Sequence, residues 1–401
     1  MKRNRNIARG LLAAGLVAMA ASTGAGGQAE DKAEAANLVI TNAKIWTGSE
    51  QAPEAEAVAV RDGRIVAVGT EADVRPRIGP DTRVIDAKAR RVIPGITDAH
   101  THVISAGLLS RQLYLREAKD RADFVRQVEE KAKQLGPSKW ILGGRWSVDS
   151  WADPSPPCKE WVDAVTPDNP LFLSRMDGHM ALANSAALKI AGITREGPTD
   201  PEGGRIDRDP TTGEPTGLLR DDAMELVTSL IPEPDDAELD AAFAAAMEQA
   251  HHWGITMVHD MSEWRHIETF RRAAERGKLT LRVYSFYYSE DWDEGLSRIK
   301  AFGPGNEWLR IGGFKGFMDG SLGSRTAYMA EPFCDNPPEQ KDWHGLLVAM
   351  ADPPQEMLAR CKMADRAGMQ TAVHSIGDQA NHILLDIYAQ VAAEDGPRDR
   401  R

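Results

Sequence analysis

The stretch that decides the fold is residues 94–102, which read Pro-Gly-Ile-Thr-Asp-Ala-His-Thr-His. An apolar pair, Val92 and Ile93, enters the Pro-Gly turn, and the chain leaves the turn as a strand that carries His100 and His102. Alternate side chains of a strand point to the same face, so two imidazoles at this spacing can share one cation. Taken alone, the pair fits two metal ligands or two ordinary histidines at a strand end equally well.

The composition indicates a large protein without a nucleic-acid partner. The chain has 401 residues, 42% of them hydrophobic, and a formal net charge of -12. This length allows one large domain or about two to three ordinary ones. Because binding to a phosphate backbone relies on clustered Lys and Arg, we expect no nucleic acid. We expect a small-molecule substrate, and a homo-oligomer is compatible with the sequence.

The first 29 residues have the pattern of a secretory signal peptide. A basic start, with Lys2 and Arg3, precedes an apolar stretch over residues 11–21 that is too short to span a bilayer. Small residues follow, and we expect cleavage near Ala29. The mature chain is then expected to be periplasmic or secreted without a stable membrane anchor. A retained anchor is the less favoured alternative.

The three cysteines do not form a metal-binding motif. Cys158, Cys334 and Cys361 are far apart and lack C-x-x-C spacing. In an exported protein one disulfide can form, whereas buried free thiols fit the sequence at least as well. The sequence leaves this choice open.

Short alternating strands precede the histidine stretch. Residues 38–40 and 58–60 have this pattern, and residues 61–64 predict a tight turn into a strand over 65–69. We therefore expect a small β module over residues 37–91.

Strands that end in polar residues then alternate with helices. The expected strands lie at residues 254–260, 281–285, 309–315 and 369–374, and helices are expected at 240–252 and 354–367. This alternation is typical of a parallel β/α barrel, whose active site forms at the carboxyl ends of the strands. The segment over about residues 103–248 does not fit a simple βα unit. We interpret it as an insertion after the first barrel strand that covers the barrel mouth.

Five separated motifs together resemble the amidohydrolase superfamily, specifically its family-3 branch, which includes N-substituted formamide deformylase. The motifs are residues 94–102, residues 175–179 with 184–188, residues 213–219, Lys315 with 319–321, and residues 374–378. Each motif is weak alone, whereas their order and spacing are specific. The resemblance covers the chain from Leu38 to its last residue.

The resemblance implies a (β/α)8 TIM-like barrel over residues 92–401, an N-terminal β-sandwich module and a metal centre. It implies that His100 and His102 hold the first metal, that Lys315 is carboxylated and bridges two metals, and that His374 holds the second. The cofactor is then one or two divalent ions, with zinc first and iron, manganese or nickel as alternatives. A salt-bridged lysine is the alternative for Lys315, and a substrate-contacting histidine is the alternative for His374.

Two residues of the insertion, Arg175 and His179, are the expected substrate-binding residues, because Arg binds carboxylates through two parallel hydrogen bonds. The alternative for Arg175 is an ion pair, with Asp177 for example, that holds the insertion together. His259 ends a strand and is a weaker candidate. Asp378 is expected to orient the nearby histidine or to cap the following helix.

The family pattern continues with a histidine on the sixth strand and an aspartate on the eighth. Neither has a counterpart before Arg401. We therefore expect a barrel that is incomplete at its carboxyl end, with the catalytic aspartate outside this sequence. An open barrel leaves strand edges unpaired, so this polypeptide alone is expected to fold poorly and to be nearly inactive.

The function that the resemblance implies is hydrolysis of an amide-type or formamide-type C–N bond by metal-activated water. Deamination and the opening of a cyclic amide on the same scaffold are enzymatic alternatives. A degenerate periplasmic protein without catalysis is the alternative outside enzymes. Nothing in the sequence identifies the substrate.

Overall fold

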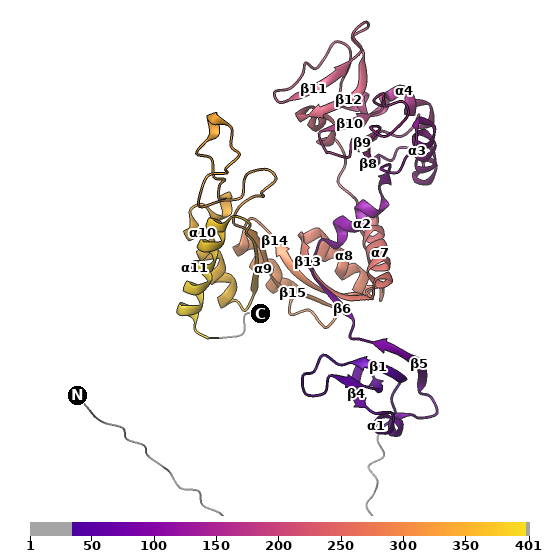
Figure 1. Cartoon of the computed structure of the whole chain (residues 1–401), viewed down its shortest axis with the longest axis vertical. Helices are drawn as coiled ribbons and strands as arrows, with labels where there is room; N and C mark the ends of the chain where they lie inside the picture. The colour runs from indigo at the N-terminus through magenta and orange to yellow at the C-terminus, as the bar shows by residue number, and fades with distance from the viewer. Residues whose placement is uncertain (1–33, 398–401) are drawn as a thin grey trace, which may run out of the picture. The chain divides into compact units, whose positions relative to one another are not determined.

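A computed structural model describes residues 34–397 of the chain, and these residues form two compact units that divide after Pro94 (Figure 1). The expected signal peptide, residues 1–29, lies outside the described residues. In the described part, no helix combines the length and the apolar character that a membrane crossing requires.

The first unit contains one five-stranded sheet. Its strands are β1 (Leu38–Trp46), β2 (Glu54–Ala55), β3 (Ala57–Arg61), β4 (Arg64–Gly69) and β5 (Arg83–Val92). β1 pairs antiparallel with β2 and β3 and parallel with β5. The expected turn between β3 and β4 forms, and its central residues Asp62 and Gly63 have φ angles of 51° and 75°. Positive φ at both central residues is the geometry of a type I′ hairpin.

The second unit contains a five-stranded parallel sheet with the order β16-β15-β14-β13-β6. Its strands are β6 (Ile96–Thr101), β13 (Ile255–Ser262), β14 (Arg282–Tyr288), β15 (Leu309–Phe317) and β16 (Gln370–His374). All four strands expected after the insertion are confirmed, each starting at the expected residue or one residue later. Parallel strands present their carboxyl ends at one edge of the sheet, which places their last residues together.

Helices alternate with these strands, as the barrel pattern predicts (Figure 1). They are α2 (Val103–Arg111), α7 (Asp236–His252), α8 (Trp264–Glu275), α9 (Trp292–Phe302), α10 (Pro354–Arg366) and α11 (Asp378–Asp395). The expected helices at residues 240–252 and 354–367 correspond to α7 and α10. α7 begins with a capping box, in which Asp235 and Glu238 each accept the other's main-chain N–H. The result is a mixed α/β fold.

Helix α2 packs closely on α7 at Gly107. A Cβ atom at this glycine would lie 2.0 Å from the carbonyl oxygen of Ala242 in α7. Only a residue without a side chain allows this approach of two helix backbones. The contact holds together the chain segment that leaves β6 and the one that returns to β13.

The residues between α2 and α7 form a second sheet of six strands, in the order β11-β12-β10-β9-β8-β7. The strands are β7 (Leu113–Tyr114), β8 (Ile141–Trp146), β9 (Leu171–Arg175), β10 (Met180–Ala183), β11 (Gly204–Arg208) and β12 (Pro215–Asp221). Short helices accompany them: α3 (Arg121–Leu135), α4 (Lys159–Val162), α5 (Ser185–Ile190) and α6 (Glu225–Thr228). We call residues 113–228 the insertion below.

The insertion has its own hydrophobic core. Phe124 of α3 meets the rings of Trp151 and Trp161 edge-on, and these two tryptophans stack on each other with ring centroids 6.4 Å apart. A self-contained core of aromatic side chains can stabilise the six-stranded sheet independently of the parallel sheet.

All three cysteines are free. Cys361 is buried in α10, Cys158 is half-buried and Cys334 is exposed. Burial raises the pKa of the Cys361 thiol to about 12, so this thiol is unreactive at neutral pH. The choice that the sequence left open is therefore resolved in favour of free thiols.

Candidate functional site

The two histidines of the opening stretch lie at the end of the first parallel strand. His100 belongs to β6, and His102 follows the strand as the residue that precedes the first turn of α2. Both side chains are exposed, and their ring centroids are 5.9 Å apart. The strand end therefore presents two neighbouring imidazoles to solvent.

Lys315 lies on β15 and is buried, with 4% of its surface exposed. Its Nζ atom is 4.8 Å from the centroid of the Phe317 ring. Burial lowers the pKa of the Lys315 ammonium, because the charged form loses its hydration. A lysine in this state gives up its proton more readily than one on the surface.

His374 is the last residue of β16 and lies opposite Phe317 in the register with β15. Its Nε2 atom is 2.8 Å from the carbonyl oxygen of Gly320. A carbonyl oxygen only accepts hydrogen bonds, so Nε2 carries the proton and donates. The lone pair of Nδ1 is then free to bind a ligand.

The other three expected metal ligands act electrostatically on His100. Partial burial lowers the pKa of His100, and the nearby charges of Lys315, His102 and, more weakly, His374 add to this effect, whereas Asp98 opposes it. A lowered pKa keeps the His100 imidazole neutral at neutral pH, which is the form that coordinates metals. The structure thus brings the side chains of three strands within range of one another.

The chemistry of this donor set fits a divalent metal only if the lysine takes part. Within residues 34–397, no three His, Cys, Asp or Glu side chains converge closely enough to hold a metal ion. The imidazoles therefore do not make a site by themselves, and the remaining donor is Lys315. The hydroxyl of Ser375, directly after His374, is buried and has no hydrogen-bond partner among the described residues.

Asp260, which the sequence did not single out, supports the same strand ends. It lies on β13, is 0% exposed, and accepts the main-chain N–H of Val103 at 2.6 Å and the hydroxyl hydrogen of Ser262. Burial raises the pKa of the Asp260 carboxyl group, although both hydrogen bonds oppose this. Since Val103 directly follows His102, the hydrogen bond from the Val103 N–H to Asp260 fixes the main chain next to His102. The neighbouring His259 instead contacts the ring of Tyr284.

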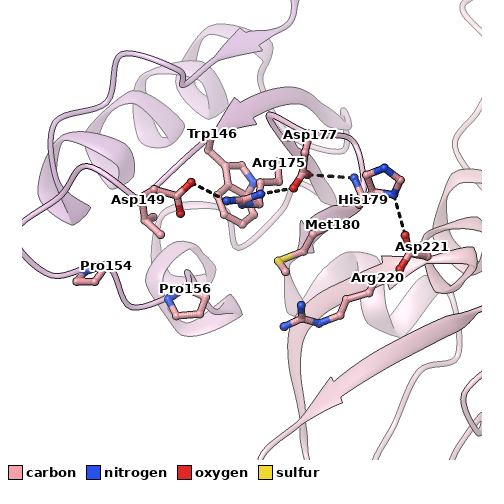
Figure 2. A pocket seen from close by; sticks show the side chains of 11 residues that line it. Trp146, Asp149, Pro154, Pro156, Arg175, Asp177, His179, Met180, Arg220 and Asp221 are labelled. Carbon is pink, nitrogen blue, oxygen red and sulfur yellow. Dashed lines mark hydrogen bonds and ion pairs between the residues drawn. The ribbon is translucent and has the colours of Figure 1, made fainter. Parts of the chain in front are cut away.

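The expected substrate-binding residues lie in the insertion, at a separate cavity of about 400 Å³ (Figure 2). Trp146 and Met180 give it apolar walls, together with two prolines. Its charged and prolyl lining residues are Asp149, Pro154, Pro156, Arg175, Asp177, His179, Arg220 and Asp221. Arg175 and His179 therefore line one pocket, and their expected contact with a substrate stays a prediction.

Most charges of this pocket pair with one another, as Figure 2 shows, whereas Arg220 pairs with Asp207, which does not line the pocket. The Arg175 guanidinium forms ion pairs with Asp149, at 2.7 Å, and with Asp177. Burial acts to lower the pKa of Arg175, but these two carboxylates outweigh it, and the pKa of Arg175 is raised. His179, whose side chain is 78% exposed, bonds Asp221 at 2.9 Å. The ion pair with Asp177 that the sequence analysis named for Arg175 is present, and substrate binding by Arg175 stays a prediction.

Of the two roles expected for Asp378, its contacts agree with binding the start of the following helix, α11, and not with orienting His374. Its carboxylate accepts the main-chain N–H groups of Ala330 and Gln379, both at 2.8 Å. The His374 ring lies instead beside the carboxylate of Asp319, whose Oδ1 atom is 4.0 Å from Nε2. The sequence analysis had placed Asp319 in a motif but had given it no role.

A sequence model of the amidohydrolase family matches residues 83–401. The chain belongs to the amidohydrolase family. Among its relatives, the protein LONG AFTER FAR-RED 3 of Arabidopsis thaliana is 40% identical over 91% of this chain and 63% of its own length. N-substituted formamide deformylase of Arthrobacter pascens is 30% identical over 88% of this chain and 66% of its own length.

A solved structure, that of an uncharacterized metal-dependent hydrolase from Pyrococcus furiosus, matches 88% of this amidohydrolase and 70% of its own chain. The TM-score is 0.70 and the sequence identity is 26%. The amidohydrolase therefore shares its α/β fold with a metal-dependent hydrolase. It spans about two thirds of the length of the two curated relatives named above.

Proposed function

We propose that this amidohydrolase is a metal-dependent hydrolase of an amide-type or formamide-type C–N bond. One observation carries the proposal: His100, Lys315 and His374 lie on three parallel strands of one sheet, His102 directly follows the first of these strands, and the charges of the other three groups act on His100. The similarity to N-substituted formamide deformylase supports the bond type. We further propose that the parallel sheet is part of a (β/α)8 barrel and that the N-terminal sheet is part of a β-sandwich.

The residues of the strand ends would act as ligands. His100, His102 and Lys315 would hold one ion, and Lys315 and His374 a second, with zinc as the first expectation for imidazole donors. A divalent metal lowers the pKa of water toward neutrality and polarises a carbonyl group. His100 and His102 are exposed, so a substrate carbonyl could approach them from solvent.

The environment of Lys315 favours its modification. A neutral amine adds to carbon dioxide, which forms an N–C bond and releases one proton, and the product is an anionic carbamate. Because burial lowers the pKa of Lys315, the neutral amine is more abundant than at a surface lysine. The carbamate would supply the oxygen ligands that an ammonium group lacks.

The insertion pocket would bind the part of the substrate that does not react. Its apolar walls suit a hydrophobic N-substituent, and Arg175 and His179 suit a carboxylate or carbonyl group. To receive such a group, Arg175 would exchange one of its two carboxylate partners for the substrate. We also propose that the protein acts outside the cytoplasm, as the pattern of its first 29 residues suggests.

The test is the double substitution His100→Ala and His102→Ala in the full-length protein. We expect the bound metal to fall, and the turnover of a panel of N-substituted formamides and simple amides to fall by at least about a hundredfold. His252→Ala, which changes an exposed histidine of α7, is the control and should leave both unchanged. Unchanged metal content and turnover in the double variant would contradict the proposal.

A further inference from the structure

A buried carboxylate joins the loops that follow β15 and β16. Asp319 is 1% exposed and accepts three main-chain N–H groups. Its Oδ1 atom accepts from Ile376 at 3.0 Å, and its Oδ2 atom accepts from Gly377 at 2.7 Å and from Tyr328 at 2.9 Å. Such bonds to a charged acceptor are stronger than bonds between neutral groups. The Asp319 clamp, as we call these three bonds, therefore fixes both loops.

The backbone around the clamp leaves little room for movement. A Cβ atom at Gly377 would lie 2.0 Å from the carbonyl oxygen of Tyr328, and one at Gly320 would lie 2.0 Å from Oγ1 of Thr326. The main-chain N–H of Ala380 also donates to the Tyr328 carbonyl at 3.1 Å. The two loops thus meet backbone to backbone at the end of the sheet.

The clamp places the hydrogen-bond acceptor of His374. The acceptor is the carbonyl of Gly320, the residue directly after Asp319, at 2.8 Å from Nε2. The loop that holds Ile376 and Gly377 begins directly after His374. A carboxylate that fixes the segments on both sides of this bond fixes the imidazole and its protonated nitrogen.

We propose that Asp319 is the positioning residue of His374: through the Asp319 clamp it holds the imidazole in the form protonated at Nε2, with Nδ1 directed away from Gly320. Its consequence for metal binding rests on the proposed function, in which His374 is a ligand. The positioning itself is a property of the chain and does not depend on a metal.

Asp319→Asn tests the clamp with almost no change of volume. The amide keeps one oxygen acceptor, but its NH2 group cannot accept the N–H groups that one of the two carboxylate oxygens now receives. Asp378→Asn is the matched control, because Asp378 accepts the N–H of Ala330 in the same pair of loops but is exposed. Gly377→Ala is a second variant, which opens the same contact and leaves the carboxylate in place.

The first readout is nitrogen NMR of metal-free, full-length protein labelled with 15N-histidine, at a pH where histidine is neutral. The chain has only 10 histidines, and His374→Gln assigns the signal. We expect the parent and Asp378→Asn to show His374 protonated at Nε2, and Asp319→Asn and Gly377→Ala to show a mixture of both tautomers. The second readout is cobalt affinity, which we expect to fall about tenfold in Asp319→Asn.

The outcomes separate this inference from the proposed function. A parent His374 protonated at Nδ1, or an unchanged tautomer in whichever of the two clamp variants folds, overturns the inference. A parent that binds no cobalt contradicts the proposed function, and the tautomer then decides the inference alone. An equal change in Asp378→Asn would also overturn the role of Asp319, since any disturbance of the loops would then suffice.

Discussion

The strand-end cluster of His100, His102, Lys315 and His374 and the pocket of the insertion are both polar, but they are built in opposite ways. The strand-end cluster places solvent-facing imidazoles above a buried lysine and the buried carboxylates of Asp260 and Asp319. The insertion pocket has exposed carboxylates, of which Asp149 and Asp177 pair with the partly buried Arg175 and Asp221 pairs with His179.

The two regions differ in what stabilises their carboxylates: main-chain N–H groups in the strand-end cluster, and water together with ion pairs in the insertion pocket. Asp260 and Asp319 accept main-chain N–H groups from distant segments, so the protein must supply these partners once water is removed. The carboxylates around Arg175 remain hydrated and can change partners at little cost. A fixed arrangement suits ligands whose geometry must not change, and an exchangeable one suits recognition of a substrate.

The largest effect is expected at Lys315. Lys315→Met keeps a long apolar side chain in the buried site but removes the nitrogen. Because the loss of an outer partner of a metal ligand already costs about 10–100-fold, the loss of a ligand should lower kcat/KM by more than about a hundredfold. Steady-state kinetics and metal analysis would measure this, with the exposed Lys300→Met as control. A loss below about tenfold would show that Lys315 is a structural lysine.

The next effect is on stability and separates the two regions directly. Asp260→Ala leaves the N–H of Val103 and the hydroxyl of Ser262 buried without a partner, so the free energy of unfolding should fall by about 3 kcal/mol. Asp149→Ala, in the insertion pocket, should lower the free energy of unfolding much less than Asp260→Ala does, since its carboxylate is exposed and its ion pair is weakened by water. Urea denaturation measures both. If both variants lost the same free energy of unfolding, the buried carboxylate of Asp260 would be no more important for stability than the exposed one of Asp149.

A smaller effect is expected at Arg175. If the guanidinium holds the substrate without taking part in bond cleavage, Arg175→Gln should raise KM about tenfold and leave kcat unchanged. Arg195→Gln, at an exposed arginine of the insertion paired with Glu196, is the control. A lowered kcat at constant KM would place Arg175 in the chemical step instead.

The smallest effect is a difference in pH dependence. Hydrogen bonds from Ser147 and Arg175 lower the pKa of Asp149, and bonds from His179 and Arg175 lower that of Asp177 although burial opposes them. Their contribution to stability is therefore present above the ordinary aspartate pKa of about 3.9 and is lost as the pH falls through the lowered folded values.

The measurement is the Tm of the parent and of Arg175→Gln. The parent should have the higher Tm at about pH 6, and the difference should vanish near about pH 2.5. The pH dependence expected for the buried Asp260 has the opposite sign, because burial raises its pKa. The stability that Asp260 contributes is present below its unfolded-state pKa and is lost as the pH rises through its folded-state pKa. A Tm difference that persists in acid would show that the ion pairs of Arg175 do not stabilise the insertion.

The sequence predicts the parallel strands well, because each has a local apolar pattern with a polar end. It predicts the insertion only in outline, since apolar pieces near residues 140–142 and 171–173 do not reveal a six-stranded sheet. The four expected metal ligands came from the resemblance to a family, and their role as ligands stays a prediction. The supporting carboxylates Asp260 and Asp319 act on residues far away in the sequence, and local patterns carry no signal of such contacts.

The pairing of β6 with β13 has a consequence for synthesis. Ile96 of β6 lies opposite Ile255 of β13, so the ribosome makes the whole insertion after β6 and before β13. At about 5–20 residues per second, a ribosome takes roughly ten to thirty seconds over this interval. During that time β6 has no partner in the parallel sheet, while the insertion can already bury its own aromatic core. The order of translation thus favours a chain whose inserted part folds first and whose surrounding sheet assembles around it afterwards.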